Sequence, residues 1–311
     1  MIGLIGDRAG FLQTGGIRTL VQLLKGRLDN EGLRYRILTA THAATTDCSA
    51  VLVVGCGSPW AYGLALKTLL QRPRLFIHWI PCFHPPQFVR HRLKARLALW
   101  ALRRLQWMGV HVYTLTQAEH ATLNNGRCTM LSLPFDCEKT FAESKGPHVN
   151  SILHRRYALA FLGRPVAQKG WPQFLKIVKS LDAECLALIP FHPTEICPEN
   201  LKIDIGLSDA DISEQLLQCQ LLILPSDYES FGFAQAEALL SGCCVPVLGS
   251  WPLWLDIPEL DWRLLTTSQI AERAQALLTQ PAALQSLQTQ QLQSWMRRPE
   301  RRAPPLPKLH G

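Results

Sequence analysis

Two glutamates, Glu229 and Glu237, stand eight residues apart in the segment SDYESFGFAQAEALLSGCCVPVLGS, residues 226–250. The preceding run LLILPS predicts a strand that ends near Pro225, and FAQAEALLSG predicts a helix that begins near Phe233. Glu229 then lies in the connecting loop, whereas Glu237 lies one turn inside the helix. A solvated helix face is the alternative for Glu237, but its apolar neighbours favour burial, where an unpaired carboxylate is costly.

The predicted start of this helix has the properties of an anion site. Its free N–H groups and the positive end of the helix dipole favour a negatively charged group. Gly232 lets the backbone approach such a ligand closely. The carboxylates of Glu229 and Glu237 would flank the anion and accept hydrogen bonds from hydroxyl groups. A phosphate with polyol groups on either side describes a sugar nucleotide.

Two cations occupy a comparable place earlier in the chain. In LAFLGRPVAQKGWPQFLKIV a strand ends at Gly163, and Arg164 and Lys169 follow before a helix that starts near Trp171. Both side chains carry full positive charge, and the arginine fork suits phosphate oxygens. On this stretch alone, the two cations either bind a phosphate-bearing ligand or are solvated loop residues.

The elements that must position these residues are short apolar strands alternating with helices. The expected strands lie at 1–6, 35–40, 50–57, 74–80, 111–116, 157–163, 185–190, 221–226 and 244–249. Many are apolar on both faces, which is typical of parallel sheets covered by helices, so the pattern predicts α/β architecture. A helix at 16–32 is closed by Gly32. Pro246 is expected near a strand end or edge, because proline removes a ladder hydrogen bond.

The pattern restarts near residue 150, after a polar segment with Gly and Pro at 144–156. The length of 311 residues suits two domains of roughly 150 residues each. We expect a first domain at 1–148, a second at 149–285, and a C-terminal helix with a basic, Pro-rich tail at 286–311. Two such halves would place a cleft between them.

The first half is strongly basic. Residues 1–148 carry 18 Lys and Arg against 8 Asp and Glu, whereas residues 149–311 carry 14 against 16, which indicates an anionic partner for the first half. Its segment 88–109 predicts a basic amphipathic helix, with one face formed by Leu93, Leu97, Trp100 and Ala101. This helix either meets a membrane surface or packs its apolar face on the core. No nucleic-acid binding motif accompanies the charge.

The ten cysteines contain no CxxC pair, which favours buried free thiols in a reducing compartment over a zinc site. MIGLIGDRAG lacks a basic leader, and no apolar run reaches the roughly 18 residues that a transmembrane helix needs. The expected location is the cytoplasm, with peripheral contact at the inner face of an anionic membrane.

Two segments together resemble a known family. RPVAQKGWPQFL and DADISEQLLQCQLLILPSDYESFGFAQAEALLSGCCVPV look like the donor half of the retaining glycosyltransferases of family 4, which have the GT-B fold. That family carries a Glu-x7-Glu motif followed by Ala, Gly and Pro-Val, and four residues follow here in register: Ala238, Gly242, Pro246 and Val247. In the first half, TGGIRTLVQLLKGRL, WIPCFHPP and TLTQAEHATL resemble the family's glycine-rich loop, its Pro-His-aromatic-His-Pro segment and its Ser-x-x-Glu helix start. The resemblance covers roughly residues 1–250 and implies two Rossmann-like domains facing a central cleft.

The resemblance implies a role for each residue of the donor motifs. Arg164 and Lys169 would bind the donor diphosphate and stabilise the charge of the leaving group. Glu229 would hydrogen-bond the transferred sugar, and Glu237 would bind the ribose hydroxyls. The phosphate or sugar would also meet backbone groups, those of Phe231, Gly232 and Phe233. No metal or other cofactor is then required, and the sequence has no Asp-x-Asp motif to hold a metal.

In the first domain, the resemblance implies that Gly15 and Gly16 approach the donor phosphates. The chain departs from the family at Cys82, where many relatives have His, which leaves His84 as the acceptor-side candidate; a structural histidine is the alternative. A second departure follows Val247, where LGSWPLWLDIPEL lacks the usual Gly-Gly, so no function is carried over to it.

The resemblance thus implies a metal-independent retaining hexosyltransferase. Such an enzyme would move a sugar from a UDP- or GDP-linked donor to a glycan or lipid-linked acceptor, as in cell-surface polysaccharide or lipopolysaccharide synthesis. A non-catalytic nucleotide-sugar-binding scaffold is the alternative. A nucleotide-dependent oxidoreductase is disfavoured, because GCGSPW at 55–60 has Trp60 where the dinucleotide fingerprint needs its third glycine.

Overall fold

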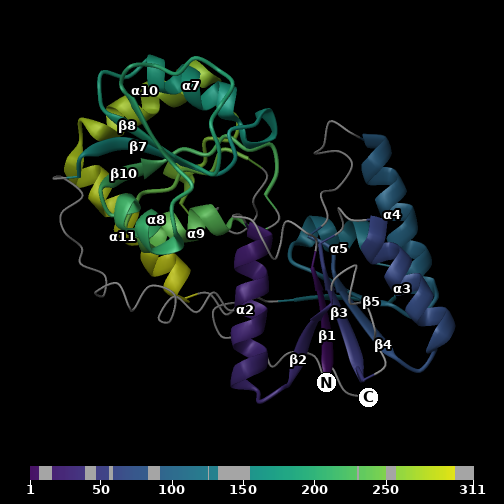
Figure 1. Cartoon of the computed structure of the whole chain (residues 1–311). Coiled ribbons are helices and arrows are strands. Elements are labelled where there is room, and N and C mark those ends of the chain that lie inside the picture. Colours follow the sequence, from purple (N-terminus) through teal and green to yellow (C-terminus); the bar gives the residue numbers. More distant parts are fainter. Residues whose placement is uncertain are drawn as a thin grey trace. The chain divides into compact units, whose positions relative to one another are not determined.

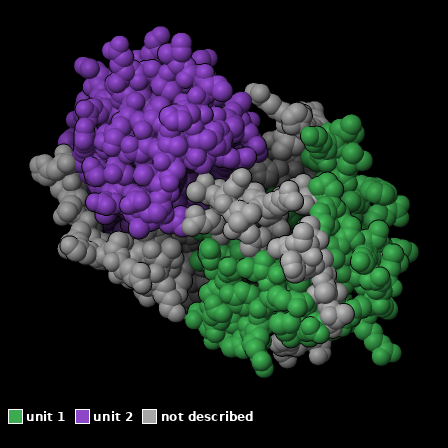
Figure 2. Space-filling model, in the orientation of Figure 1, with its two compact units in different colours: residues 1–135, 299–311 green, residues 136–298 purple. Residues whose placement is uncertain are grey.

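The computed structural model describes the protein over residues 1–6, 16–38, 47–55, 59–82, 92–124, 126–131, 155–229, 231–249 and 257–297. The described residues up to Leu131 form one compact unit, and those from Arg155 to Arg297 form a second (Figure 2). Each unit contains a wholly parallel sheet flanked by helices, as the alternation of strands and helices predicts (Figure 1).

The first unit is built on a six-stranded sheet with the order β2-β1-β3-β4-β5-β6. Its strands are β1 (Ile2–Gly6), β2 (Tyr35–Leu38), β3 (Ala50–Val54), β4 (Phe76–Ile80), β5 (His111–Thr114) and β6 (Cys128–Met130). Its helices are α2 (Gly16–Asn30), α3 (Pro59–Gln71), α4 (Arg92–Trp107) and α5 (Gln117–Leu123). Every residue of β3 is buried, so both faces of the sheet are covered, with α2 on one side and α3 and α4 on the other (Figure 1).

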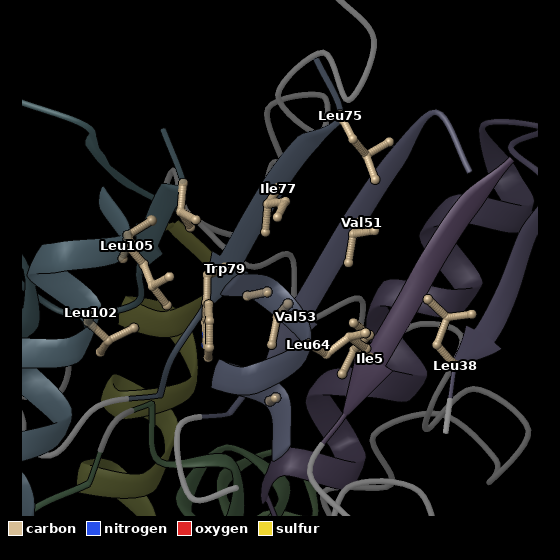
Figure 3. Close-up of a cluster of buried hydrophobic side chains, with 14 of the residues drawn as sticks. Ile5, Leu38, Val51, Val53, Leu64, Leu75, Ile77, Trp79, Leu102 and Leu105 are labelled. Carbon is tan, nitrogen blue, oxygen red and sulfur yellow. The ribbon is translucent and has the colours of Figure 1, made fainter. Parts of the chain in front are cut away.

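The core beneath α3 and α4 is formed by the side chains of every second residue along neighbouring strands, because successive strand side chains point to opposite faces of the sheet. Figure 3 shows Ile5, Val53 and Trp79, from three adjacent strands, on the same side of the sheet. Leu64 of α3 and Leu102 of α4 pack onto this layer. The periodicity of each strand therefore fixes which of its side chains the helices bury.

The second unit has a four-stranded sheet with the order β10-β7-β8-β9. The strands are β7 (Tyr157–Leu162), β8 (Cys185–Ile189), β9 (Leu201–Ile205) and β10 (Cys219–Leu222). The α-helices are α7 (Trp171–Lys179), α8 (Asp209–Leu216), α9 (Phe233–Leu240), α10 (Thr267–Leu278) and α11 (Pro281–Arg297), with 3-10 turns η3 (Ala167–Lys169) and η5 (Pro258–Leu260). Helices α7 and α10 lie on one side of the sheet, and α8, α9 and α11 lie on the other (Figure 1).

The strand expected at 244–249 does not form. Within this segment, Cys244 and Val247 make isolated bridges, to Leu221 and Asp261 respectively. The backbone of Val245 is instead satisfied by the buried Gln291 of α11, whose Oε1 accepts from the Val245 N–H at 2.8 Å while its Nε2 donates to the Val245 carbonyl at 2.6 Å. A side-chain amide thus takes the place of a strand neighbour beside Pro246, which cannot donate to a ladder. Strands β6 and β9, in contrast, were not expected from the sequence.

The C-terminal helix begins at Pro281 rather than near residue 286. Its bond from Gln291 to Val245 and its contacts with α9 and α10 make it part of the second unit. The predicted boundary between residues 148 and 149 falls within 132–154, and most of the predicted tail falls within 298–311. Both stretches lie outside the described residues.

Candidate functional site

Two loops of the second unit begin at the same edge of its sheet. Strands β10 and β7 pair in parallel, with Leu222 opposite Ala160, so the segments that follow them leave side by side. Gly170, at the end of the first loop, packs so closely on Pro225 of the second that a Cβ at Gly170 would lie 2.1 Å from the Pro225 carbonyl oxygen. The absence of a side chain at Gly170 therefore permits the two loops to touch.

Lys169 and Glu229 meet where these loops adjoin. The Lys169 ammonium forms an ion pair with Oε1 of Glu229, and both side chains are largely buried. The hydroxyl of Ser226 donates to the same carboxylate oxygen at 2.6 Å, and Ser226 is itself buried. A cation and a carboxylate that are sixty residues apart in the chain thus occupy one place.

The loop that carries Lys169 is anchored from the side of α7. Trp171 and Phe174 of this helix pack against Phe161 of β7, with ring centroids 5.1 Å and 5.0 Å from that of Phe161. All three rings are fully buried. Arg164 lies in the same loop with its side chain exposed, so the structure places both predicted cations between β7 and α7.

The predicted helix start at Phe233 is confirmed as the first residue of α9. Gly232 precedes it in a left-handed conformation (φ 85°, ψ 46°), and among the described residues no side chain caps this end of the helix. Phe231 and Phe233 are buried against each other, with ring centroids 4.6 Å apart. Their side chains belong to the core, so only their backbone groups are left for the predicted contact with an anion.

Glu237 lies on α9 in a strongly desolvated position. Burial raises the pKa of its carboxyl to about 8, and the negative charge of Asp209 on α8 adds to this shift. Desolvation disfavours the charged form of a carboxylate. The Glu237 carboxyl is therefore stabilised when it is protonated or when it accepts hydrogen bonds from hydroxyl groups. The sequence expectation that Glu237 is not on a solvated face agrees with this environment.

Only some of the site residues predicted in the first unit lie among the described residues. Gly15 and His84 lie outside the described residues, and Gly16 is the first residue of α2. Cys82, which departs from the His expected from the resemblance, adopts a left-handed backbone (φ 47°). His78 is structural: its Nδ1 is 3.0 Å from the Tyr113 hydroxyl in the sheet, and burial lowers its pKa to about 4.

The segment TLTQAEHATL contains the capped start of a helix, as its likeness to a Ser-x-x-Glu helix start predicts. The hydroxyl of Thr116 accepts from the Glu119 N–H, and the Glu119 carboxylate accepts from the Leu115 N–H at 2.8 Å. Glu119 is fully buried in this arrangement. The Ser-x-x-Glu type of motif is therefore satisfied locally, at the start of α5.

Three residues of the site were missed from the sequence: Ser226, Gly170 and Asp209. Ser226 stands three residues before Glu229 and directly after the predicted end of the strand. This position could have identified it as a site residue from the sequence. The contact of Gly170 with Pro225 and the effect of Asp209 on Glu237 join distant segments, so no local pattern announces them.

Within the described ranges, no cluster of three or more His, Cys, Asp or Glu side chains is arranged to hold a metal ion. None of the helices in the part of the chain that the structure describes is long and apolar enough to cross a bilayer. Among the described residues, the predicted donor-site charges are Arg164 and Lys169 between β7 and α7, Glu229 after β10, and Glu237 on α9.

Comparison with known proteins finds solved structures that resemble the chain in fold. No family model and no curated protein sequence matches the chain. Sucrose-phosphate synthase from Thermosynechococcus elongatus superimposes with a TM-score of 0.71 at 12% identity, over 95% of this chain and 94% of that one.

Two further structures are similar over most of the chain. A glycosyltransferase involved in avilamycin A biosynthesis gives a TM-score of 0.54 at 13% identity, over 95% of each chain. The UDP-forming α,α-trehalose-phosphate synthase from Burkholderia vietnamiensis gives 0.53 at 11% identity, over 92% of this chain and 75% of that one. The two parallel sheets and these structural similarities together show that the chain has the α/β GT-B fold.

Proposed function

We propose that this protein is a metal-independent retaining glycosyltransferase of the family 4 type. It would transfer a hexose from a UDP- or GDP-linked donor to a glycan or lipid-linked acceptor. The observation that carries the proposal is the meeting of Lys169 and Glu229 between two adjoining strand ends, in the unit that also contains the start of α9, where the N-cap residue is Gly232. This set offers a cation for a diphosphate and a carboxylate for sugar hydroxyls.

The similar structures support the same class of reaction. Their names describe a sucrose-phosphate synthase, a glycosyltransferase and a UDP-forming trehalose-phosphate synthase. The double-glutamate spacing and the two cations, which the sequence shares with family 4, fall in the unit where a nucleotide sugar would bind.

Donor binding would rearrange the ion pair. In the free protein Lys169 and Glu229 neutralise each other. A diphosphate would compete for Lys169 and would also attract Arg164 and the N–H groups at Gly232 and Phe233. Glu229 would then accept hydrogen bonds from the hydroxyls of the transferred sugar, and Glu237 from those of the ribose.

Transfer would break the bond between the anomeric carbon and the phosphate oxygen of the donor. The acceptor hydroxyl oxygen would bond to the same face of that carbon, and its proton would pass to the departing diphosphate. Negative charge grows on the diphosphate as this bond breaks, so Lys169 and Arg164 would stabilise the transition state. Removal of one such contact costs about 3 kcal/mol in the barrier.

The first unit would supply the acceptor side. His84 is proposed to contact the acceptor, and Gly15 and Gly16 to approach the donor phosphates. Its strong positive charge suits a lipid-linked or otherwise anionic acceptor at the inner face of a membrane. Cell-surface polysaccharide or lipopolysaccharide assembly is the proposed setting.

The test is product detection by intact mass after incubation with mixed nucleotide sugars and cell-envelope lipid extract. We expect the wild type to form a glycosylated product in the presence of a metal chelator. Lys169→Met and Glu229→Gln should each lower the rate at least a hundredfold, whereas Lys179→Met, on the exposed side of α7, should not.

Two outcomes would contradict the proposal. If no nucleotide sugar binds, the donor site is wrong. If a donor binds with an affinity that depends on Lys169 but no acceptor in a broad panel is modified, the non-catalytic scaffold is the better description.

A further inference from the structure

Helix α4 has two apolar faces, of which only one meets the core. Leu102 and Leu105 point into the layer beneath the sheet (Figure 3), and Ala98 and Leu99 pack beside them. An ordinary surface helix would present polar residues on its opposite face.

The opposite face of α4 is instead apolar and exposed to solvent. Leu93, Leu97, Trp100 and Trp107 are 72%, 58%, 60% and 81% exposed, respectively. Together with Arg104 they recur at intervals of four, three, four and three residues, so they form one continuous stripe along the helix. The alternative that this apolar face packs on the core is therefore wrong for these residues, although Ala101, expected on the same face, is half-buried.

Cations border the stripe. Lys94 and Arg96 are exposed, and the guanidinium of Arg104 lies over the ring of Trp100, 5.7 Å from its centroid. Arg103 is engaged with α5, where it donates to the Thr122 carbonyl at 2.9 Å. Arg104 within the stripe and Lys94 and Arg96 beside it are thus placed to meet an anionic surface together with the apolar side chains.

The surrounding sequence contains no opposing charge. No Asp or Glu occurs from Cys48 to Ala118, a stretch that holds nine Lys and Arg. Glu119, which follows directly, is buried in the cap of α5. The charge pattern is complementary to an anionic partner, and the exposed tryptophans and leucines require that partner to offer an apolar phase as well.

We propose that α4 docks flat on the surface of a bilayer that contains anionic phospholipids. Leucine and tryptophan would enter the boundary between headgroups and acyl chains, and Lys94, Arg96 and Arg104 would contact lipid phosphates. A nucleic acid would use the charge but not the apolar stripe. The inference rests on α4 alone and does not depend on the proposed sugar transfer.

The test is co-sedimentation of the full chain with vesicles of phosphatidylcholine, with and without phosphatidylglycerol. We expect binding to the anionic vesicles only, and its loss as salt shortens the Debye length from about 10 Å at roughly 0.1 M to about 3 Å at roughly 1 M. Lys94→Gln with Arg96→Gln should weaken binding about 30-fold, at about 1 kcal/mol per charge and 1.4 kcal/mol per factor of ten. Trp100→Ser with Trp107→Ser should weaken it at least tenfold.

The matched controls lie in the second unit. Lys176→Gln with Lys179→Gln removes two exposed cations of α7, and Leu264→Ser removes an almost fully exposed leucine; neither should change vesicle binding. Equal binding to neutral vesicles, or no effect of the α4 variants, would overturn the proposal. Self-association that disappears in Trp100→Ser with Trp107→Ser would assign the stripe to a second copy of the chain instead.

Discussion

At the scale of the residue, Glu229 is held by two neighbours of different chemistry. The Lys169 ammonium pairs with its Oε1, and the Ser226 hydroxyl donates to the same oxygen. The proposed role assigns Oε2 to a sugar hydroxyl. Ser226 is then a positioning residue, because it acts on the donor through the carboxylate that it orients.

Ser226→Ala should lower kcat/KM for sugar transfer about tenfold to a hundredfold, since a hydrogen bond to a charged group contributes roughly 1.5–3 kcal/mol. Affinity for the free nucleoside diphosphate, which has no transferred sugar, should stay unchanged. Ser180→Ala, at the exposed end of α7, is the control. A loss of nucleoside diphosphate affinity equal to the loss of turnover would show that Ser226 supports the loop as a whole.

Glu237 makes stability depend on pH. Its pKa in the folded protein is raised to about 8, whereas an unperturbed Glu titrates near 4.3. Between about pH 4.3 and pH 8 the folded state therefore binds more protons, and stability falls as pH rises, by up to about 1.4 kcal/mol per unit. Above pH 8 both states are ionised and the dependence ends.

Glu237→Gln should remove this dependence. The variant should match the wild type near pH 5 and exceed its free energy of unfolding by a few kcal/mol near pH 8, because the wild type must ionise a desolvated carboxyl. Urea unfolding over a pH series measures this. Glu272→Gln, at an exposed position of α10, should keep the wild-type slope. Parallel pH profiles for Glu237→Gln and the wild type would contradict the prediction.

At the scale of the element, the site depends on how closely two loops approach. The loops after β7 and β10 touch at Gly170 and Pro225, and this contact sets Lys169 beside Glu229. Gly170 also has a positive φ of 73°, so a side chain there meets two obstacles, the backbone conformation and the Pro225 carbonyl.

Gly170→Ala should separate these two effects when it is compared with Gly206→Ala. Gly206 has a similar φ of 66° but no atom within 4 Å of its added Cβ, so its variant should lose only about 1 kcal/mol from the left-handed backbone. Gly170→Ala should lose at least about 2 kcal/mol more and should also weaken nucleoside diphosphate binding. Equal destabilisation in urea unfolding would mean that the loops adjust to the added methyl group without strain.

At the scale of the whole molecule, two functions are proposed for two units of different charge. The charged donor-binding side chains are assigned to the second unit, and lipid binding to α4 of the first, whose half of the sequence holds the excess of Lys and Arg. Each unit has its own sheet and core, so a ligand of one unit need not change the other.

Hydrogen exchange should resolve the two sites in one protein sample. UDP or GDP should protect amides at Gly170 and at the start of α9, because a ligand that binds only the folded state suppresses opening at its site. Anionic vesicles should protect α4 and leave those amides unchanged. Protection of the start of α9 by vesicles, or of α4 by the nucleotide, would contradict this division of roles.

The sequence by itself determined what depends on neighbours in the chain. The strand pattern, the start of α9 at Phe233, the end of α2 just before Gly32 and the spacing of Glu229 and Glu237 all follow from local periodicity and from residues with special backbone freedom. These features identified the α/β class and placed the candidate site at the carboxyl ends of strands.

Only the tertiary structure decided which distant groups meet. Glu229 is paired with Lys169 because β7 and β10 are neighbours in the sheet, and Val245 bonds to Gln291 of α11 instead of forming a strand. The exposed stripe of α4 has the same physical origin. A periodic pattern shows that a helix has an apolar face, but the packing of the whole unit decides whether a neighbour covers that face, because contact depends on sheet order and helix placement rather than on sequence spacing.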